Sequence, residues 1–312
     1  MKASQTQKKI LLPLDGSVRS LGTVRYIAKI KAFHEMQVVL FHVHAGAPES
    51  YFDMKKDPRS TGTVAYVRAW EVQQRRNAAV YMTKAKQMLL GAGFSEDAVT
   101  VKIQKRRQGI ARDIIKEARQ GYNAVVARRR GLGALRGMVL GSVANKLLER
   151  LDFLPLLLAG RKPAGNNILL GFDGSPGAVQ AVDFVKSILG SSDVRLCLLH
   201  VIRGRSDVPP ENKTIYSPRE YLEGIEKEMA LRLDEIKAEL VQSGFKANSV
   251  TTKIISGAQS RAAAIVEEAR NNDCGTIVLG RRGLSQVRTF FIGRVTNKVV
   301  HMAKDRTVWI VR

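Results

Sequence analysis

The chain alternates short runs of apolar residues with longer stretches in which apolar residues recur at helical spacing. Residues 10–14 form one short run, and the stretch that follows carries apolar residues at steps of three, namely Val18, Leu21, Val24, Ile27 and Ile30. This spacing places the five side chains on one stripe of a helix, which we expect to pack on a sheet. A strand pattern followed by a helix pattern, repeated along the chain, is typical of βαβ units on a parallel sheet.

The same pattern occurs twice. Three pairs of segments match in the same order: 8–17 with 166–175, 41–44 with 199–202, and 128–146 with 280–298. The first two pairs are shifted by 158 residues and the third by 152, so only a loop-sized difference separates the two copies. Matches that keep their order at nearly constant spacing indicate a duplicated domain.

The two copies predict an α/β fold with two tandem open parallel five-stranded sheets of the Rossmann-like type, with helices on both faces. We expect the first domain at residues 1–160, a linker at 161–167 and the second domain at 168–312. Each copy ends in an apolar strand, at 154–159 and 307–311. Because an exposed apolar edge invites aggregation, we expect these two strands to pack together and to join the domains as a pseudo-twofold pair within one chain.

The amino-acid composition excludes disulfide-rich and membrane-spanning classes of protein. With 45% hydrophobic and 25% charged residues among 312, the chain has the composition of an ordinary folded protein. Two cysteines are too few for a disulfide scaffold and fit a reducing compartment. The first apolar run is broken at Asp15, and no stretch reaches the roughly 18 apolar residues of a membrane helix. We therefore expect a cytoplasmic protein without integral membrane association.

The charge is far from balanced. The chain has 51 Lys and Arg against 28 Asp and Glu, a net charge of +23. Basic clusters lie at residues 75–76, 105–107 and 128–130. They are either solvated surface or a field that attracts nucleic acid and other polyanions without sequence preference. Aromatic residues make up only 6% of the chain, so a stacking platform for bases is not expected.

Loops at three predicted strand ends carry the residue types of a phosphate site. In the second copy Asp173 follows the first strand, Val201 ends the second, and Gly280, Gly283 and Gly293 follow the fourth. In open parallel sheets, ligands bind at the carboxyl ends of strands where the strand order reverses. Glycines between a strand and a helix let backbone N–H groups approach phosphate oxygens, and the helix N-terminus adds positive potential.

This arrangement resembles the universal stress protein family, whose ATP-binding members carry Gly-x-x-Gly, nine residues, then Gly followed by Ser or Thr. The resemblance covers essentially the whole chain as two tandem family domains. It implies an adenine-nucleotide-binding type of fold and a stress-response regulatory protein that holds ATP or AMP in its second domain. The residues that it implies as the site in that domain are Asp173, Val201, Gly280, Gly283, Gly293 and Arg294.

Two departures from the family pattern affect the expected sites. Arg294 stands where the family has Ser or Thr, and it either pairs with phosphate, as Arg281 or Arg282 could, or fills the phosphate's space. In the first copy Arg128 replaces the leading glycine, so we expect a degenerate site there. The residues of that first-domain site are Asp15, Val43, Gly131, Gly141 and Ser142.

The sequence supports neither a metal site nor a catalytic group. The five histidines lack metal-ligand spacing, and no serine has a histidine placed as its base. His42 and His200 are expected to be structural, and Asp15 is expected to cap its helix. The leading hypothesis is a non-enzymatic module that senses or stores adenine nucleotide. The alternative is a nucleotide-independent, basic interaction protein, and a slow ATPase is a third option.

Overall fold

The computed structural model describes residues 7–44, 46, 61–130, 139–161, 165–190, 193–204, 218–284 and 292–312, with the side chains of 61–64 and 218 left out. The chain forms two compact units. The first contains residues 1–28 and 34–147, and the second contains 29–33 and 148–312. The sequence-based domain limits at 160 and 168 stay a prediction of where the copies end and begin.

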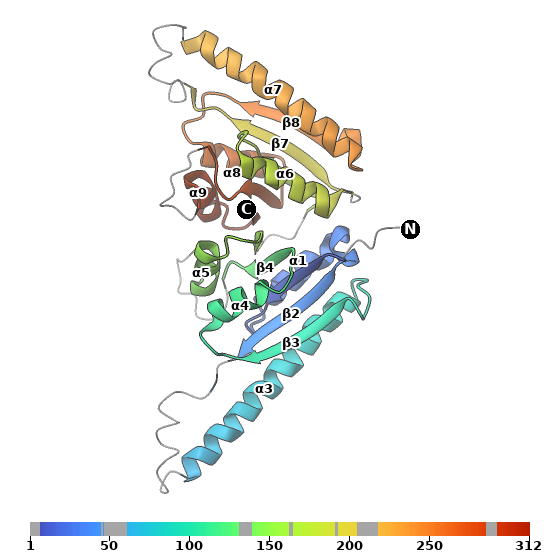
Figure 1. Ribbon diagram of the computed structural model, residues 1–312, viewed down its shortest axis with the longest axis vertical. Coiled ribbons are helices and arrows are strands. Elements are labelled where there is room, and N and C mark those ends of the chain that lie inside the picture. Colours follow the sequence, from blue (N-terminus) through green and yellow to red (C-terminus); the bar gives the residue numbers. More distant parts are fainter. Residues whose placement is uncertain are drawn as a thin grey trace. The chain divides into compact units, whose positions relative to one another are not determined.

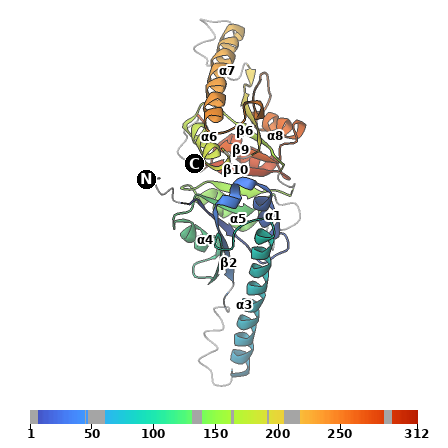
Figure 2. The same ribbon diagram turned by 90° about the vertical axis from the view of Figure 1, so that its right-hand side faces the viewer.

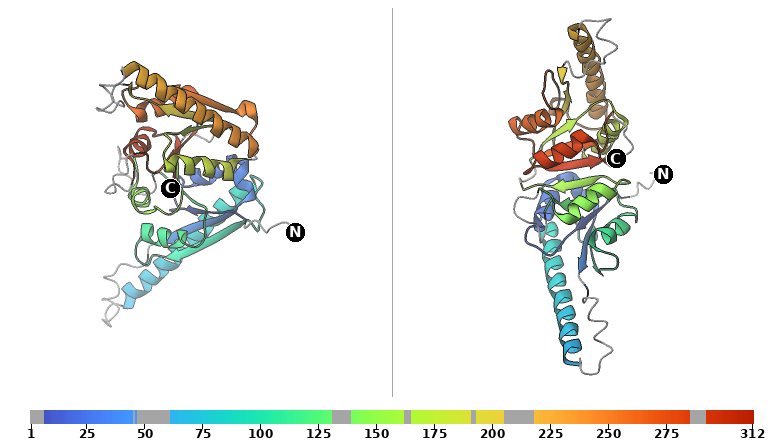
Figure 3. Two further views of the ribbon diagram at one scale, coloured as in Figure 1. Left: turned by 45° about the horizontal axis from the view of Figure 1, so that its top comes forward. Right: turned by 90° about the vertical axis from the view of Figure 1, so that its left-hand side faces the viewer.

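The first unit is built on four parallel strands in the order β3-β2-β1-β4. These are β1 (Lys9–Pro13), β2 (Gln37–His44), β3 (Val99–Lys105) and β4 (Ala124–Arg128). Its helices are α1 (Leu21–Lys29), α3 (Thr61–Leu90), α4 (Ile110–Ala118) and the first part of α5 (Ser142–Arg150). Figures 2 and 3 show α3 running beside the sheet, with its N-terminal part extending past the ends of the strands.

The second unit has six strands in the order β8-β7-β6-β9-β10-β5. They are β5 (Leu156–Ala159), β6 (Asn167–Gly171), β7 (Arg195–Val201), β8 (Val250–Ile255), β9 (Thr276–Gly280) and β10 (Thr307–Val311). Its helices are α6 (Pro176–Leu189), α7 (Pro218–Gln242), α8 (Arg261–Asn271) and α9 (Arg294–Met302). Helices α6 and α7 cover one face of the sheet and α8 and α9 the other (Figures 1 and 2). Short 3₁₀ turns occupy Lys31–Glu35 and Ala247–Ser249.

The α/β fold in two tandem copies is confirmed, and so is the pairing of the two last strands. Strand β10 pairs with β5, and Trp309 lies opposite Leu157. This pair is antiparallel and joins the last strands of the two copies, whereas the other described strand pairs are parallel, so the sheet is mixed but largely parallel. Both β5 and β10 are buried along their whole length. Their pairing therefore covers the apolar edge that each copy would otherwise expose.

Local sequence chemistry determines several element ends. The hydroxyl of Ser175 accepts a hydrogen bond from the N–H of Ala178 at 3.2 Å, and Pro176 occupies the first helical position of α6. Gly93 and Gly244, which follow α3 and α7, have φ angles of +101° and +110°, as expected of left-handed helix ends. Residues 217–220 have the sequence of a capping box, but Ser217 lies outside the described residues.

The predicted stripe of the first helix is wrong at its start. Helix α1 begins at Leu21, and Val18 is 76% exposed in the turn before it. The N–H of Ser20 instead bonds the hydroxyl and the carbonyl of Ser17, at 3.1 Å each, which closes a tight turn. Val18 fits the three-residue spacing of the apolar positions, but it lies in this hydrogen-bonded turn and not in the helix.

Trp309 anchors the core of the second unit. Its side chain is fully buried on β10. The Phe33 and Phe184 rings pack against it, with ring centroids 6.1 and 5.7 Å from that of Trp309. Since Phe33 lies in the short segment 29–33, this contact helps to hold that segment in the second unit. Among the described residues, no helix is both long and apolar enough to cross a membrane.

We expect Trp309→Ala to destabilise the second unit by about 3–5 kcal/mol, because truncating a buried aromatic residue leaves a cavity between its neighbours. Urea unfolding followed by far-UV circular dichroism measures the change. Trp70→Ala is the control, because Trp70 is only half-buried on α3 in the first unit. An equal loss of stability in both variants would contradict the role given to Trp309.

Candidate functional site

A cavity of about 520 Å³ opens at the carboxyl ends of β6, β7 and β9 in the second unit. After β8 the chain returns to the other side of β6, so the strand order reverses between β6 and β9. A crevice at that switch point is the place where open parallel sheets bind ligands. The volume lies within the roughly 300–1,000 Å³ common for small-molecule sites.

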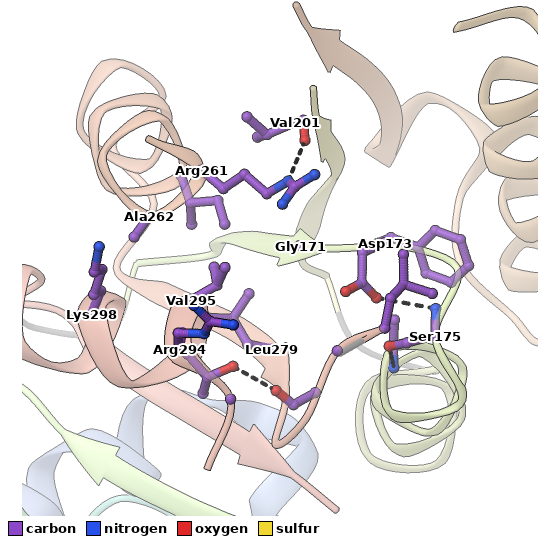
Figure 4. A pocket seen from close by; sticks show the side chains of 18 of the residues that line it. Gly171, Asp173, Ser175, Val201, Arg261, Ala262, Leu279, Arg294, Val295 and Lys298 are labelled. Atoms are coloured by element: carbon purple, nitrogen blue, oxygen red, sulfur yellow. Dashed lines mark hydrogen bonds between the residues drawn. The ribbon is translucent and has the colours of Figure 1, made fainter. Parts of the chain in front are cut away.

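The six residues that the sequence assigned to a second-domain site all line this cavity. They are Asp173, Val201, Gly280, Gly283, Gly293 and Arg294. They come from three strand ends and from the start of α9, and Figure 4 shows the side chains of Asp173, Val201 and Arg294 around one space. Their place in a single cavity is therefore a finding, while their contact with nucleotide stays a prediction.

Asp173 is held by a turn that leads into α6. Its Oδ1 accepts a hydrogen bond from the N–H of Ser175 at 3.1 Å. Its Oδ2 faces Gly283 so closely that a Cβ atom at position 283 would collide with this oxygen. A side chain at 283 would therefore displace the Asp173 carboxylate.

Gly280 lines the cavity and also lies directly against α6. A Cβ atom at position 280 would lie 2.6 Å from the carbonyl carbon and 2.7 Å from the carbonyl oxygen of Gly177. The first turn of α6 therefore lies directly beside Gly280. Gly177 lies equally close to the loop that follows β9, since a Cβ at position 177 would collide with the carbonyl oxygen of Arg282. The glycines bring the helix start directly against the strand end.

Arg128 changes this packing in the first copy. Its guanidinium lies beside α1, where a Cβ at Gly22 would be 2.8 Å from Nη1. Helix α1 begins six residues after Asp15, whereas α6 begins three residues after Asp173. A long side chain at the end of β4 thus lies against the start of α1, whereas in the second unit Gly280 lies against the first turn of α6.

The other first-domain residues lie at the expected ends of elements. Asp15 accepts a hydrogen bond from the N–H of Ser17 at 3.0 Å, which is the same turn as at Asp173. Val43 is buried near the end of β2, and Gly141 directly precedes α5, which starts at Ser142. Gly131 lies outside the described residues.

Arg281 does not face the cavity as a countercharge. It is only 5% exposed, and its guanidinium donates to the carbonyls of Leu151 at 3.0 Å and Leu148 at 2.5 Å. These acceptors lie at the C-terminal end of α5, where a cation is favourable. Burial lowers the pKa of Arg281 from its usual value. Arg129, its counterpart in the first copy, is also buried, so neither is a surface charge.

Three cations that the motif did not include line the cavity as well: Arg203, Arg261 and Lys298. The Arg261 Nε donates to the carbonyl of Val201 at 3.2 Å (Figure 4). Lys298 lies one helical turn after Arg294, so the two share a face of α9. A comparison of the copies could have found Arg261, because the first copy has Ile110 at the matching start of its helix.

His42 and His200 make the same contact in the two copies. Each Nδ1–H donates at 2.7 Å to a carbonyl at the end of the neighbouring strand, that of Leu14 for His42 and of Phe172 for His200. Burial lowers the pKa of His42. The contact ties the ends of two adjacent strands, which is a structural role. In the described part of the chain, no cluster of three or more His, Cys, Asp or Glu could hold a metal ion.

Both halves of the sequence match the model of the universal stress protein family, at residues 6–158 and 165–312. A universal stress protein of Mycolicibacterium smegmatis is 28% identical over 218 residues, which are 69% of this chain and 70% of that protein. A universal stress protein structure from Archaeoglobus fulgidus superposes with a TM-score of 0.65 at 18% identity, covering 98% of this chain and 99% of the other.

A putative universal stress protein structure from Pseudomonas aeruginosa gives a TM-score of 0.57 at 16% identity over 98% of this chain and 94% of that chain. At these identities the solved structures show a shared fold alone. Membership of the family is shown by the family model, which matches each of the two copies. Because the family pattern occupies nearly the whole chain twice, this protein belongs to the universal stress protein family, with two family domains in tandem.

Proposed function

We propose that the second domain binds an adenine nucleotide, ATP or AMP, in the cavity at the ends of β6, β7 and β9. The observation that carries the proposal is the convergence of all six motif residues on one cavity of about 520 Å³. These residues are spread over positions 173 to 294 of the sequence. A nucleotide site at the cavity would explain why all of them line it.

The lining of the cavity fits the two chemical parts of a nucleotide. Leu199, Ile265 and Leu279 supply apolar surface for a base. Helix α9 begins at the cavity with Gly293 as its N-cap, so its first N–H groups and Arg294 face the place of an anion. A phosphate at this end and a base at the apolar end would use both parts of the lining.

We assign a regulatory binding role, not catalysis, to this site. The Ser175 hydroxyl accepts from the N–H of Ala178 and so serves the helix cap. His200 uses its Nδ1–H for the carbonyl of Phe172. The Ser175 hydroxyl thus caps α6 and the Nδ1–H of His200 ties two strand ends, and these structural roles favour a module that senses or stores nucleotide.

One universal stress protein has been solved in complex with cAMP. It matches 48% of this chain at 24% identity, with a TM-score of 0.33. The proposal for this chain therefore rests on the cavity and its lining, and not on that likeness.

We expect Ala262→Phe to weaken ATP and AMP binding by more than about tenfold, a loss of about 1.4 kcal/mol. Ala262 is buried in the cavity wall at the start of α8, so a phenyl ring there would project into the ligand's space. Isothermal titration of the full chain with each nucleotide measures the effect.

Ala111→Phe is the matched control, because Ala111 is the buried alanine at the same place in α4 of the first domain. It imposes a similar packing cost outside the cavity and should leave the nucleotide affinity unchanged. Wild-type protein that binds neither ATP nor AMP would refute the proposed function. Equal losses in both variants would place the nucleotide elsewhere.

Polyanion binding is a second candidate function, favoured by the net charge of +23 and by exposed basic side chains on the first domain. Arg75 and Arg76 lie exposed on α3, and Arg106 and Arg107 lie exposed after β3. Arg129, expected to belong to such a cluster, is buried and is excluded. Charge alone would attract nucleic acid through its phosphates.

If nucleic acid binds, the affinity should fall steeply with salt and should not depend on base sequence, because phosphate neutralisation would supply the free energy. Reversing Arg75, Arg76, Arg106 and Arg107 to Glu should reduce the slope of log K against log salt by about 0.9 for each phosphate that the variant no longer neutralises. Fluorescence anisotropy with labelled DNA measures the slope.

The control reverses four exposed arginines of the second domain, which changes the net charge equally: Arg195, Arg219, Arg232 and Arg270. A smaller effect in this control would locate binding on the first domain. Salt-insensitive binding, or strong preference for one base sequence, would contradict a purely electrostatic interaction.

A further inference from the structure

We infer that the second-domain cavity takes its nucleotide as the metal-free polyphosphate anion, so that Mg²⁺ weakens binding. The inference rests on the proposed nucleotide site and concerns the chemical form of the ligand. It follows from the charges in the cavity wall and from a comparison of the two copies.

The described lining of the cavity is strongly cationic. Its only carboxylate is that of Asp173, while five side chains in it carry a positive charge, namely Arg203, Arg261, Arg282, Arg294 and Lys298. Four of these cations are solvent-exposed, and Arg261 is half-buried with its Nε on the carbonyl of Val201. A polyphosphate entering this space would meet its countercharge in protein side chains.

Three of the five cations are absent from the matching positions of the first copy. Arg294 at the start of α9 corresponds to Ser142 at the start of α5. Arg261 corresponds to Ile110, and Arg203 corresponds to Ala45. The positive charge at these three positions is thus a property of the second copy alone and not of the shared fold.

Ser142 of the first copy and Arg294 of the second differ in whether they could ligate Mg²⁺ beside a phosphate. A hydroxyl oxygen can ligate Mg²⁺, which takes oxygen ligands in octahedral geometry. A guanidinium has donors only, cannot ligate a cation and repels one electrostatically. With Arg294 at the first position of α9 and Lys298 one turn later, the helix presents two positive charges to the cavity.

Asp173 is poorly placed to serve as a ligand for Mg²⁺ in place of the missing hydroxyl. Its Oδ1 accepts the N–H of Ser175, and its Oδ2 packs against Gly283. Mg²⁺ would therefore bring two further positive charges into a wall that already holds five, and it would cancel two of the negative charges that attract the triphosphate to that wall. Both effects act against the magnesium complex.

The test is isothermal titration of the full chain with ATP in excess EDTA and in saturating Mg²⁺, at ionic strength matched with NaCl so that screening is equal. We expect the Kd for ATP to be about tenfold higher with Mg²⁺, a difference of about 1.4 kcal/mol. AMP, which holds Mg²⁺ weakly, should bind nearly equally in the two conditions.

Arg294→Ser restores the residue of the first copy, and it should weaken metal-free ATP binding while reducing the Mg²⁺ effect to less than about threefold. Arg270→Gln removes one positive charge from the exposed far end of α8, outside the cavity, and should leave the tenfold ratio unchanged.

Binding of ATP that is equal or tighter with Mg²⁺ in the wild type would overturn the inference and leave the nucleotide site standing. An identical Mg²⁺ ratio in Arg294→Ser and wild type would also overturn it, because the effect would not come from the cavity wall. Failure of both ATP and AMP to bind under either condition would instead refute the proposed function on which the inference rests.

Discussion

The first turn of α6 lies against the end of β9 with no side chain between them, and the geometry of the second domain's cavity depends on this contact. Gly177 and Gly280 make it possible, because a Cβ atom on either would overlap the backbone of the other segment. The close approach lets the helix begin three residues after Asp173. Asp173, the start of α6 and the glycines after β9 therefore surround one space.

The first domain shows what the same fold does without that contact. Arg128 at the end of β4 extends its guanidinium to Gly22, and α1 starts later than α6 does. The turn that begins at Asp15 is unchanged, as is the contact of His42 with the strand end. The residue at the strand end and the start of the helix thus both differ between the two copies, while the order of the first four strands is the same.

Arginines next to one another in the sequence have opposite roles in the second domain. Arg281 is buried and bonds the carbonyls at the end of α5, while Arg282 is exposed and lines the cavity. Both residues follow the end of β9, and their side chains reach different surroundings. Only one of the two can add to the positive potential that we infer to select a metal-free anion.

The duplication and the α/β fold were predictable from local patterns of apolar residues, glycines and turn formers. The pairing of the last strands followed from their apolar edges, and the six motif residues of the cavity from the resemblance to a known family. Tertiary structure alone decided that the space beside Gly280 holds a helical turn, that Arg281 is buried, and that Arg203 and Arg261 reach the same cavity as Arg294. The reason is physical. Hydrophobic periodicity and turn motifs depend on residues that are close together in the sequence. The burial of a long cationic side chain depends on which distant backbone carbonyls the fold brings within its reach.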